Sequence, residues 1–198
     1  MSTKRIVPLA IAGAVALSLA ACGDDEEAAS DTTAAAPATS AAPDTTMAME
    51  AQLVTVEGVD YAFENLPESV AAGTKLEFTN ASEAEVHELV AIRLPDEETR
   101  PVAELIQLPE EEIDAIVSDT MPAVVLVAPP GEAGVAPFGD GTLTEPGRYA
   151  VLCFIPIGAD PDEFMAAMQS ESSGPPQVDG GPPHVTAGMY AELVVEEV

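Results

Sequence analysis

Short segments in which apolar and polar residues alternate are the feature of this sequence that most restricts its fold. Val59, Tyr61 and Phe63 alternate with acidic or small residues, which gives the period of two that is typical of a half-buried strand. Further strands are predicted at residues 76–79, 86–94, 123–129, 148–154 and 189–196. Short strands separated by turns, with few helices between them, predict a mainly β chain folded as a Greek-key β-sandwich.

Helix signals interrupt the strand pattern in two places. Pro101 precedes VAELIQL and Pro109 precedes EEEIDAIVSD, and a proline followed by acidic residues marks the first turn of a helix. The segment from Asp160 to Glu163 resembles a capping box and opens a helix through EFMAAMQSE. We therefore expect short helical insertions at about residues 97–120 and 159–181.

The N-terminal region resembles the leader of a bacterial lipoprotein. Lys4 and Arg5 precede an apolar run that is too short and too rich in alanine for a membrane span. The run ends in LAAC, with Cys22 as the residue that would carry the acyl chains, such as palmitate. This pattern predicts a signal peptide at residues 1–21 and a protein anchored by lipid on the extracytoplasmic side of a membrane in the bacterial cell envelope. An ordinary signal peptide, with Cys22 incidental, is the alternative.

Composition separates a tether from a folded domain and limits the partners. Residues 23–50 are mostly Ala, Thr, Pro, Ser and acids, which predicts that Cys22 is followed by a disordered tether, with the folded domain at 51–198. The chain has six Lys and Arg against 35 Asp and Glu, a formal net charge of −29. This sign excludes nucleic acid and anionic lipid head groups as partners, and it allows a cation or a cationic protein. Solubility alone is an equally good explanation of the acidity.

The scarce histidine and cysteine residues point to a metal site. With Cys22 lipidated, Cys153 has no disulfide partner in an oxidising compartment, so it is either a buried inert thiol or a ligand. His87 opens one predicted strand, Cys153 lies near the end of another, and His184 and Met189 bracket the loop before the last. Such strand ends converge at one pole of a sandwich, and two imidazoles, one thiolate and a weak axial thioether form the blue-copper arrangement. Packing alone also explains each residue taken singly.

Three segments carry a family resemblance. GTKLEFTNASEAEVHELV is similar to the plastocyanin-type segment that leads to the first histidine ligand. EPGRYAVLCF resembles the strand that carries the cysteine ligand, and PPHVTAGMYAELVVE resembles the loop with the second histidine and the methionine. Over roughly residues 53–94 and 142–198 the chain thus resembles the cupredoxin family, which implies a cupredoxin-like sandwich and one copper ion held by His87, Cys153, His184 and Met189.

The chain departs from the family pattern between two of these residues. Thirty residues separate Cys153 from His184, whereas cupredoxins usually have only a few between the corresponding ligands. The segment contains the expected helix and a Gly- and Pro-rich loop, so we expect an insertion that lies outside the site and returns to it at both ends.

The resemblance implies a function without enzyme chemistry. It implies a membrane-tethered type 1 copper protein that carries single electrons between extracytoplasmic redox partners. His184 would be the edge-exposed ligand, surrounded by an apolar docking patch of Pro182, Pro183, Val185 and Ala187. Cys153 would be the thiolate ligand and the electron path.

Two other functions stay open at this point. A lipoprotein that binds copper and hands it over would use the same ligands, with weak support from Met121, Met165 and Met168, which packing also explains. A metal-free interaction module would keep the fold and leave Cys153 as a buried free thiol.

Overall fold

The computed structural model describes residues 52–117, 120–170 and 175–198. The expected signal peptide, Cys22 and the tether to residue 50 lie outside the described residues. Within the described part, no helix is long and apolar enough to cross a membrane.

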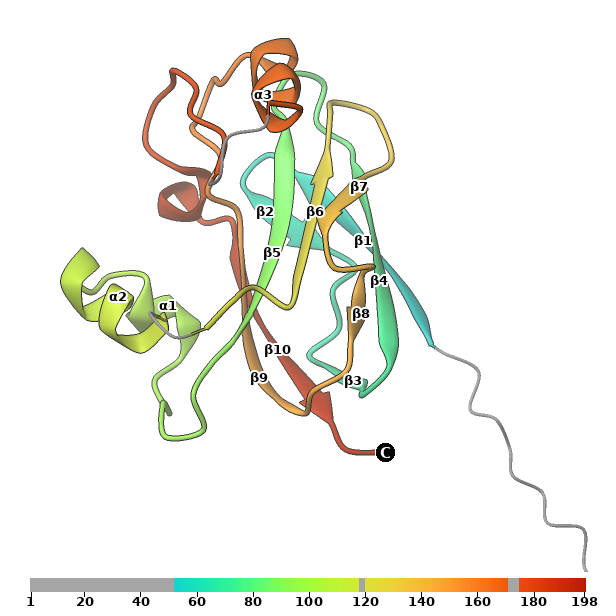
Figure 1. Ribbon diagram of the computed structural model, residues 1–198, viewed down its shortest axis with the longest axis vertical. Helices are drawn as coiled ribbons and strands as arrows, with labels where there is room; N and C mark the ends of the chain where they lie inside the picture. The colour runs from blue at the N-terminus through green and yellow to red at the C-terminus, as the bar shows by residue number, and fades with distance from the viewer. Residues whose placement is uncertain (1–51, 118–119, 171–174) are drawn as a thin grey trace, which may run out of the picture. The chain divides into compact units, whose positions relative to one another are not determined.

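The described chain forms two β-sheets that face one another (Figure 1). The four-stranded sheet has the order β2 (Ala62–Glu64), β1 (Leu53–Val59), β4 (Thr74–Asn80) and β8 (Thr142–Leu143). The six-stranded sheet has the order β3 (Ser69–Ala71), β10 (Tyr190–Glu196), β9 (Gly147–Leu152), β5 (His87–Arg93), β6 (Val124–Ala128) and β7 (Val135–Phe138). Both sheets are mixed, because β1 pairs with β4 and β3 pairs with β10 in parallel. The predicted mainly β sandwich is confirmed.

The main core fills the space between the sheets. Leu76 from β4, Leu89 from β5 and Leu193 from β10 are all completely or almost completely buried there. Fully burying a leucine side chain contributes roughly 1.5–3 kcal/mol relative to leaving it exposed, so these alternating positions hold the sheets together. The same alternation was the signal for strands in the sequence.

Strand β9 is buried on both faces. Tyr149 and Val151 point into the main core, whereas Ala150 and Leu152 belong to a second apolar cluster on the opposite face of the sheet. The short helices α1 (Val102–Leu105) and α2 (Glu110–Val117) supply the other side of that second cluster. This explains the unbroken apolar run along β9, since a strand covered on both faces has no solvent-facing side chains.

Helix α3 (Pro161–Met168) begins where the capping signal placed it. The Asp160 carboxylate accepts hydrogen bonds from the backbone N–H groups of Asp162 and Glu163, both at 3.0 Å. These bonds satisfy donors that the first helical turn leaves free. Phe164 is buried in the main core, so the helix is anchored to the sandwich at this point.

The prediction of one strand through Val59 and Phe63 is wrong. Strand β1 ends at Val59 and β2 begins at Ala62, with these two residues paired across a two-residue turn. Tyr61 takes φ 64° in that turn. Asparagine or glycine is the usual residue at such a position, and neither is present to mark the turn in the sequence.

Strand β7 lies in a segment predicted to be a loop. Glycine and proline dominate residues 129–139 and hide the strand signal, and all four β7 residues are exposed. Its pairing with β6 is irregular, with a register shift between Val125 and Val127. Strands β3 and β8 were also missed, because segments of three and two residues are too short for a detectable alternation.

Candidate metal centre

Three neighbouring strands deliver the candidate ligands to one end of the sandwich. His87 is the first residue of β5, and Cys153 follows the last residue of β9. His184 opens the short 3-10 helix η1 (His184–Ala187), and Met189 stands immediately before β10. Because β5, β9 and β10 are adjacent in the six-stranded sheet, the four residues are brought together despite their separation in sequence.

Backbone hydrogen bonds fix the ligand segments to one another. Cys153 N–H donates to the Met189 carbonyl at 3.2 Å, and Met189 N–H donates to the His184 carbonyl at 3.1 Å. Val185 N–H donates to the Cys153 carbonyl at 2.8 Å. The loop that carries His184 is therefore tied directly to the end of β9.

A glycine permits the start of β9. Gly147 has φ 140°, and a Cβ atom there would lie 2.8–3.0 Å from the guanidinium group of Arg93. Arg93 Nε in turn donates to the Pro146 carbonyl at 2.9 Å. The Pro-Gly pair in the sequence thus positions the strand that leads to Cys153, because φ 140° is a backbone conformation that favours glycine.

The donor atoms of three residues converge. His87 Nδ1 lies 3.1 Å from His184 Nδ1, and Cys153 Sγ lies 3.4 Å from His184 Nδ1. Ligand atoms of the three residues all lie within 4.8 Å of one another, and all three residues are 0% exposed.

These spacings fit donors that share one metal ion. With metal–nitrogen bonds of about 2.0 Å and metal–sulfur bonds of about 2.3 Å, ligand angles of about 100–110° place the donors about 3.1–3.5 Å apart. The observed spacings fall in that range. The fourth residue, Met189, is completely buried, and its backbone is bonded to Cys153.

The outer ring nitrogens of both histidines face carboxylates. His184 Nε2 lies 3.3 Å from Glu85 Oε2, and His87 Nε2 lies 3.9 Å from Asp60 Oδ1. Both Nε2 atoms are buried and neither makes a hydrogen bond of good geometry. A carboxylate behind the imidazole is the common second partner of a metal-bound histidine, since it favours the tautomer with the proton on the outer nitrogen and the lone pair on the inner one.

Burial keeps the three donors uncharged. Burial, and next the neighbouring His184, lower the pKa of His87 to about 4, and burial also lowers the pKa of His184. Burial, and next the charge of Glu88, raise the pKa of the Cys153 thiol to about 12. The imidazoles are therefore ready to bind a cation at neutral pH, whereas the thiol must release its proton as it becomes a ligand.

The long segment between Cys153 and His184 leaves and returns beside the site. Ile157 N–H donates to the Pro182 carbonyl at 3.0 Å, and Gly181 N–H donates to the Ile157 carbonyl at 2.8 Å. Pro156 and Pro183 form an isolated β-bridge between the same two stretches. The two ends of the insertion are thus paired, which keeps its thirty residues from separating the ligands.

Comparisons with known proteins give structural neighbours only. No protein-family model and no curated protein sequence matches the chain. Auracyanin from Roseiflexus castenholzii is similar at a TM-score of 0.41 and 16% identity, over 74% of this chain and 98% of that one. Auracyanin A, a blue copper protein from Chloroflexus aurantiacus, gives a TM-score of 0.41 and 16% identity over 74% and 100%. Auracyanin B gives 0.38 and 17% over 74% and 89%.

The sheet arrangement and the convergent cluster together decide the fold. Two facing sheets gather His87, Cys153 and His184 at the ends of adjacent strands, with Met189 fixed beside them. The described residues form the two-sheet sandwich, with the candidate ligands at one end, that the cupredoxin resemblance implied.

One expectation from the cupredoxin resemblance is wrong. His184 is not edge-exposed but completely buried, with the Tyr61 ring packed edge-on against it at a centroid distance of 5.1 Å. Val185 is buried in the second apolar cluster with residues of α1, so it is absent from any open patch. Only Pro182 and Ala187 of the expected docking patch are well exposed, and Pro183 is half-buried. Helix α1 and the β1–β2 turn cover this edge of the sandwich.

The sequence analysis did not single out several residues that shape the site. Tyr61, Glu85 and Glu88 all lie next to the three donors or to residues that hold them. Glu85 and Glu88 stand within two residues of His87 in the sequence, which was the available signal. Tyr61 is distant from every ligand along the chain, so only the fold reveals it.

Proposed function

We propose that this protein is a type 1 copper protein that carries single electrons. The convergence of two buried Nδ1 atoms and one buried Sγ atom is the observation that supports the proposal. Copper, when bound, supplies a one-electron couple between its two oxidation states. His87 Nδ1, His184 Nδ1 and Cys153 Sγ would hold it, and Met189 would be a weak fourth ligand.

The protein contributes rigidity and the exclusion of water. The three donors are completely buried, and backbone hydrogen bonds link Cys153, His184 and Met189. Because the donor atoms are held in place, they keep the same positions in both oxidation states of the metal. This lowers the reorganisation energy of each electron transfer. A protein that hands copper over needs ligands that a second protein can reach, and neither histidine nor Cys153 is accessible here.

The methionines considered for copper capture do not favour the handover function. Met165 and Met168 on α3 pack against the main core. Met121 is 72% exposed and lies apart from the three donors, lining a different surface depression near Arg93. Electron transfer is therefore the function that the geometry supports best.

Visible absorption tests the copper proposal. A Cu(II)–thiolate bond gives an intense visible charge-transfer band, so adding Cu(II) to the metal-free protein is expected to produce a blue or green colour. Cys153→Ser is expected to abolish the colour, and Met189→Leu is expected to keep it and shift the reduction potential. A protein that binds Cu(I) but stays colourless when Cu(II) is added would support the handover function instead. No binding of either ion by the folded, reduced protein would leave a metal-free interaction module.

We also propose that acyl chains on Cys22 hold the protein at the extracytoplasmic side of a membrane. The LAAC sequence and the acidic, Ala-rich segment after it support this anchoring. The partner would be a redox protein of that compartment. Cell fractionation tests the anchor: the wild-type protein should sediment with membranes and Cys22→Ser should not, whereas a freely soluble mature wild-type protein would refute it.

A further inference from the structure

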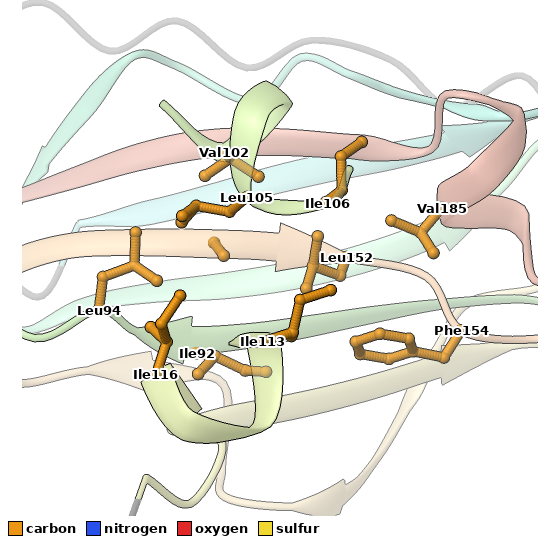
Figure 2. A pocket seen from close by; sticks show the side chains of 11 residues that line it. Ile92, Leu94, Val102, Leu105, Ile106, Ile113, Ile116, Leu152, Phe154 and Val185 are labelled. Atoms are coloured by element: carbon orange, nitrogen blue, oxygen red, sulfur yellow. The ribbon is translucent and has the colours of Figure 1, made fainter. Parts of the chain in front are cut away.

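An apolar cavity lies between helices α1 and α2 and the second face of the six-stranded sheet (Figure 2). It has a volume of about 110 Å³. Eleven described residues line it, and every one of their side chains is that of alanine, valine, leucine, isoleucine or phenylalanine. The lining side chains therefore offer a bound molecule neither a hydrogen bond nor a charge.

Polar contacts outside the cavity fix α1 to the sheet. At the start of α1 the Val102 N–H donates to Glu192 Oε2 on β10 at 3.3 Å. Arg148 on β9 donates to both carboxylate oxygens of Glu192, each at 2.9 Å, and to the Arg100 carbonyl at 2.8 Å. Because these bonds set the spacing between the first turn of α1 and the sheet, the helix cannot move inward to fill the cavity without breaking them.

The sheet side of the cavity is shaped by a small side chain. Ala150 on β9 is 5% exposed, and it shares the second face of the sheet with Leu152, two residues further along the strand. Its methyl group leaves space that a larger side chain at this position would occupy. Phe154 is the one lining residue that is exposed, so the cavity reaches solvent at that ring.

A space with such walls favours an apolar molecule over water. A buried water is stable only where two to four polar groups can bond to it, whereas apolar cavities of about 150 Å³ stay dry and bind benzene or xenon. A molecule that fills the space restores dispersion contacts that the lining atoms otherwise lack. The volume of this cavity suits a molecule of the size of benzene or smaller.

We propose that the cavity binds a small, uncharged, wholly apolar molecule, no larger than a single six-membered carbon ring. The site is separate from the metal centre, because no candidate metal ligand is among the lining residues. It nevertheless lies beside that centre, since Leu152 directly precedes Cys153 and Val185 directly follows His184. A bound molecule would touch these two neighbours of the candidate ligands.

A titration with benzene tests the site in the metal-free, full-length protein. Benzene is expected to shift the amide NMR signals of Leu152 and Val185 saturably, as binding to one site requires. The variant Ala150→Val is expected to weaken this binding at least about tenfold, because two added carbon groups occupy the space that the ring needs. Ala71→Val is the matched control, since Ala71 is a half-buried strand residue at the edge of the same sheet and does not line the cavity.

The position of bound benzene can be measured without any variant. Nuclear Overhauser effects from the benzene protons to the methyl groups of Leu105, Leu152 and Val185 are expected in the wild-type protein. The same ligand should raise the urea concentration at the unfolding midpoint of the wild type and of Ala71→Val, because it binds only the folded state. Ala150→Val should show no such rise at the same benzene concentration.

Phenol tests the chemical class of the ligand. It has the same ring as benzene, and its hydroxyl group would find no partner among the lining side chains, so we expect it to bind at least about tenfold more weakly. Equal affinity for phenol and benzene would show binding to open surface and would overturn the proposal.

Three further results would overturn the proposal. The first is the absence of saturable benzene binding to the wild type, and the second is equal binding to Ala150→Val. The third is a shift of the Leu152 and Val185 signals with protein concentration and not with benzene, which would identify a second copy of the chain as the occupant. None of these results bears on copper, so the two proposals fail separately.

Discussion

At the level of single residues, Glu85 determines what the outer edge of His184 faces. Its Oε2 atom lies 3.3 Å from His184 Nε2, within a region that excludes water from the ring. A negative charge this close stabilises the oxidised, more positive form of a bound copper ion. Electrostatic effects are large here because burial reduces screening by solvent.

We predict that Glu85→Gln raises the reduction potential of the copper-loaded protein. Loss of the charge destabilises Cu(II) relative to Cu(I), and each tenfold change in that balance corresponds to about 59 mV for one electron. Voltammetry measures the shift. Glu83→Gln is the control, since Glu83 is exposed in the same loop and carries the same charge. Equal shifts in the two variants would show that only the total charge matters.

The ligands were visible in the sequence, but their surroundings were not. His87, Cys153 and His184 stood out because histidine and cysteine are scarce in this chain. The burial of His184 depends on Tyr61, which reaches it through a turn with positive φ that no glycine or asparagine marks. Contacts between residues more than a hundred positions apart follow from the packing of the whole fold, and local patterns do not record them.

At the level of elements, helices α1 and α2 cover the sheet but leave space beneath them. The cavity of about 110 Å³ is lined by apolar side chains from both helices and from β9. Ala150 is the smallest of these side chains and is itself buried. The contact between insertion and sheet is therefore less tightly packed than the main core.

We predict that Ala150→Val stabilises the protein and that Ala91→Val destabilises it. Valine at 150 buries two more carbon groups in existing space, worth up to about 1.5 kcal/mol, and it also suits a strand. Ala91 is completely buried in the main core, where an added side chain causes overpacking that costs about 1–3 kcal/mol. Urea unfolding at equilibrium measures both. Similar destabilisation by the two variants would show that the cavity closes in solution.

Element type was more predictable than element pairing. Proline and acidic residues marked the starts of the helices, and alternation marked β4, β5 and β10, because these signals are local. The parallel pairing of β1 with β4 and of β3 with β10 joins strands through the sheet hydrogen bonds, and no local pattern encodes it. The strand pattern supplied the expectation of a mainly β sandwich, whereas the cupredoxin resemblance supplied the expectation that the four candidate ligands meet at one end of it.

At the level of the whole molecule, two buried groups give the free energy of unfolding opposite responses to pH. The pKa of His87 is lowered to about 4 by burial, so stability of the metal-free protein falls as pH drops from 6.5 towards 4. The pKa of Glu88 is raised to about 7 by burial, so its contribution is complete below pH 4.5 and is lost as pH rises through 7. Between pH 4.5 and 6.5 the two contributions oppose one another.

We predict that Glu88→Gln makes the metal-free protein more dependent on pH. The amide keeps an acceptor for Phe154 N–H but cannot ionise, so only the response of the histidines remains between pH 4.5 and 6.5. Stability should then rise with pH by about 1.4 kcal/mol per unit for each histidine that stays neutral in the fold, more steeply than in the wild type. Urea unfolding at several pH values measures the slopes. Parallel curves for the two proteins would contradict the prediction.

The place of η1 and β10 in the chain determines when the centre can be completed during biosynthesis. His184 and Met189 are the last candidate ligands to be synthesised, after His87 and Cys153. β10 also supplies the strand between β3 and β9, so the six-stranded sheet closes only when that segment has been made. A nascent chain that ends before residue 184 lacks the His184 imidazole that lies 3.4 Å from Cys153 Sγ. Under the proposed copper function, metal insertion therefore follows the completion of the domain, because an interrupted chain has only two of the four candidate ligands, His87 and Cys153.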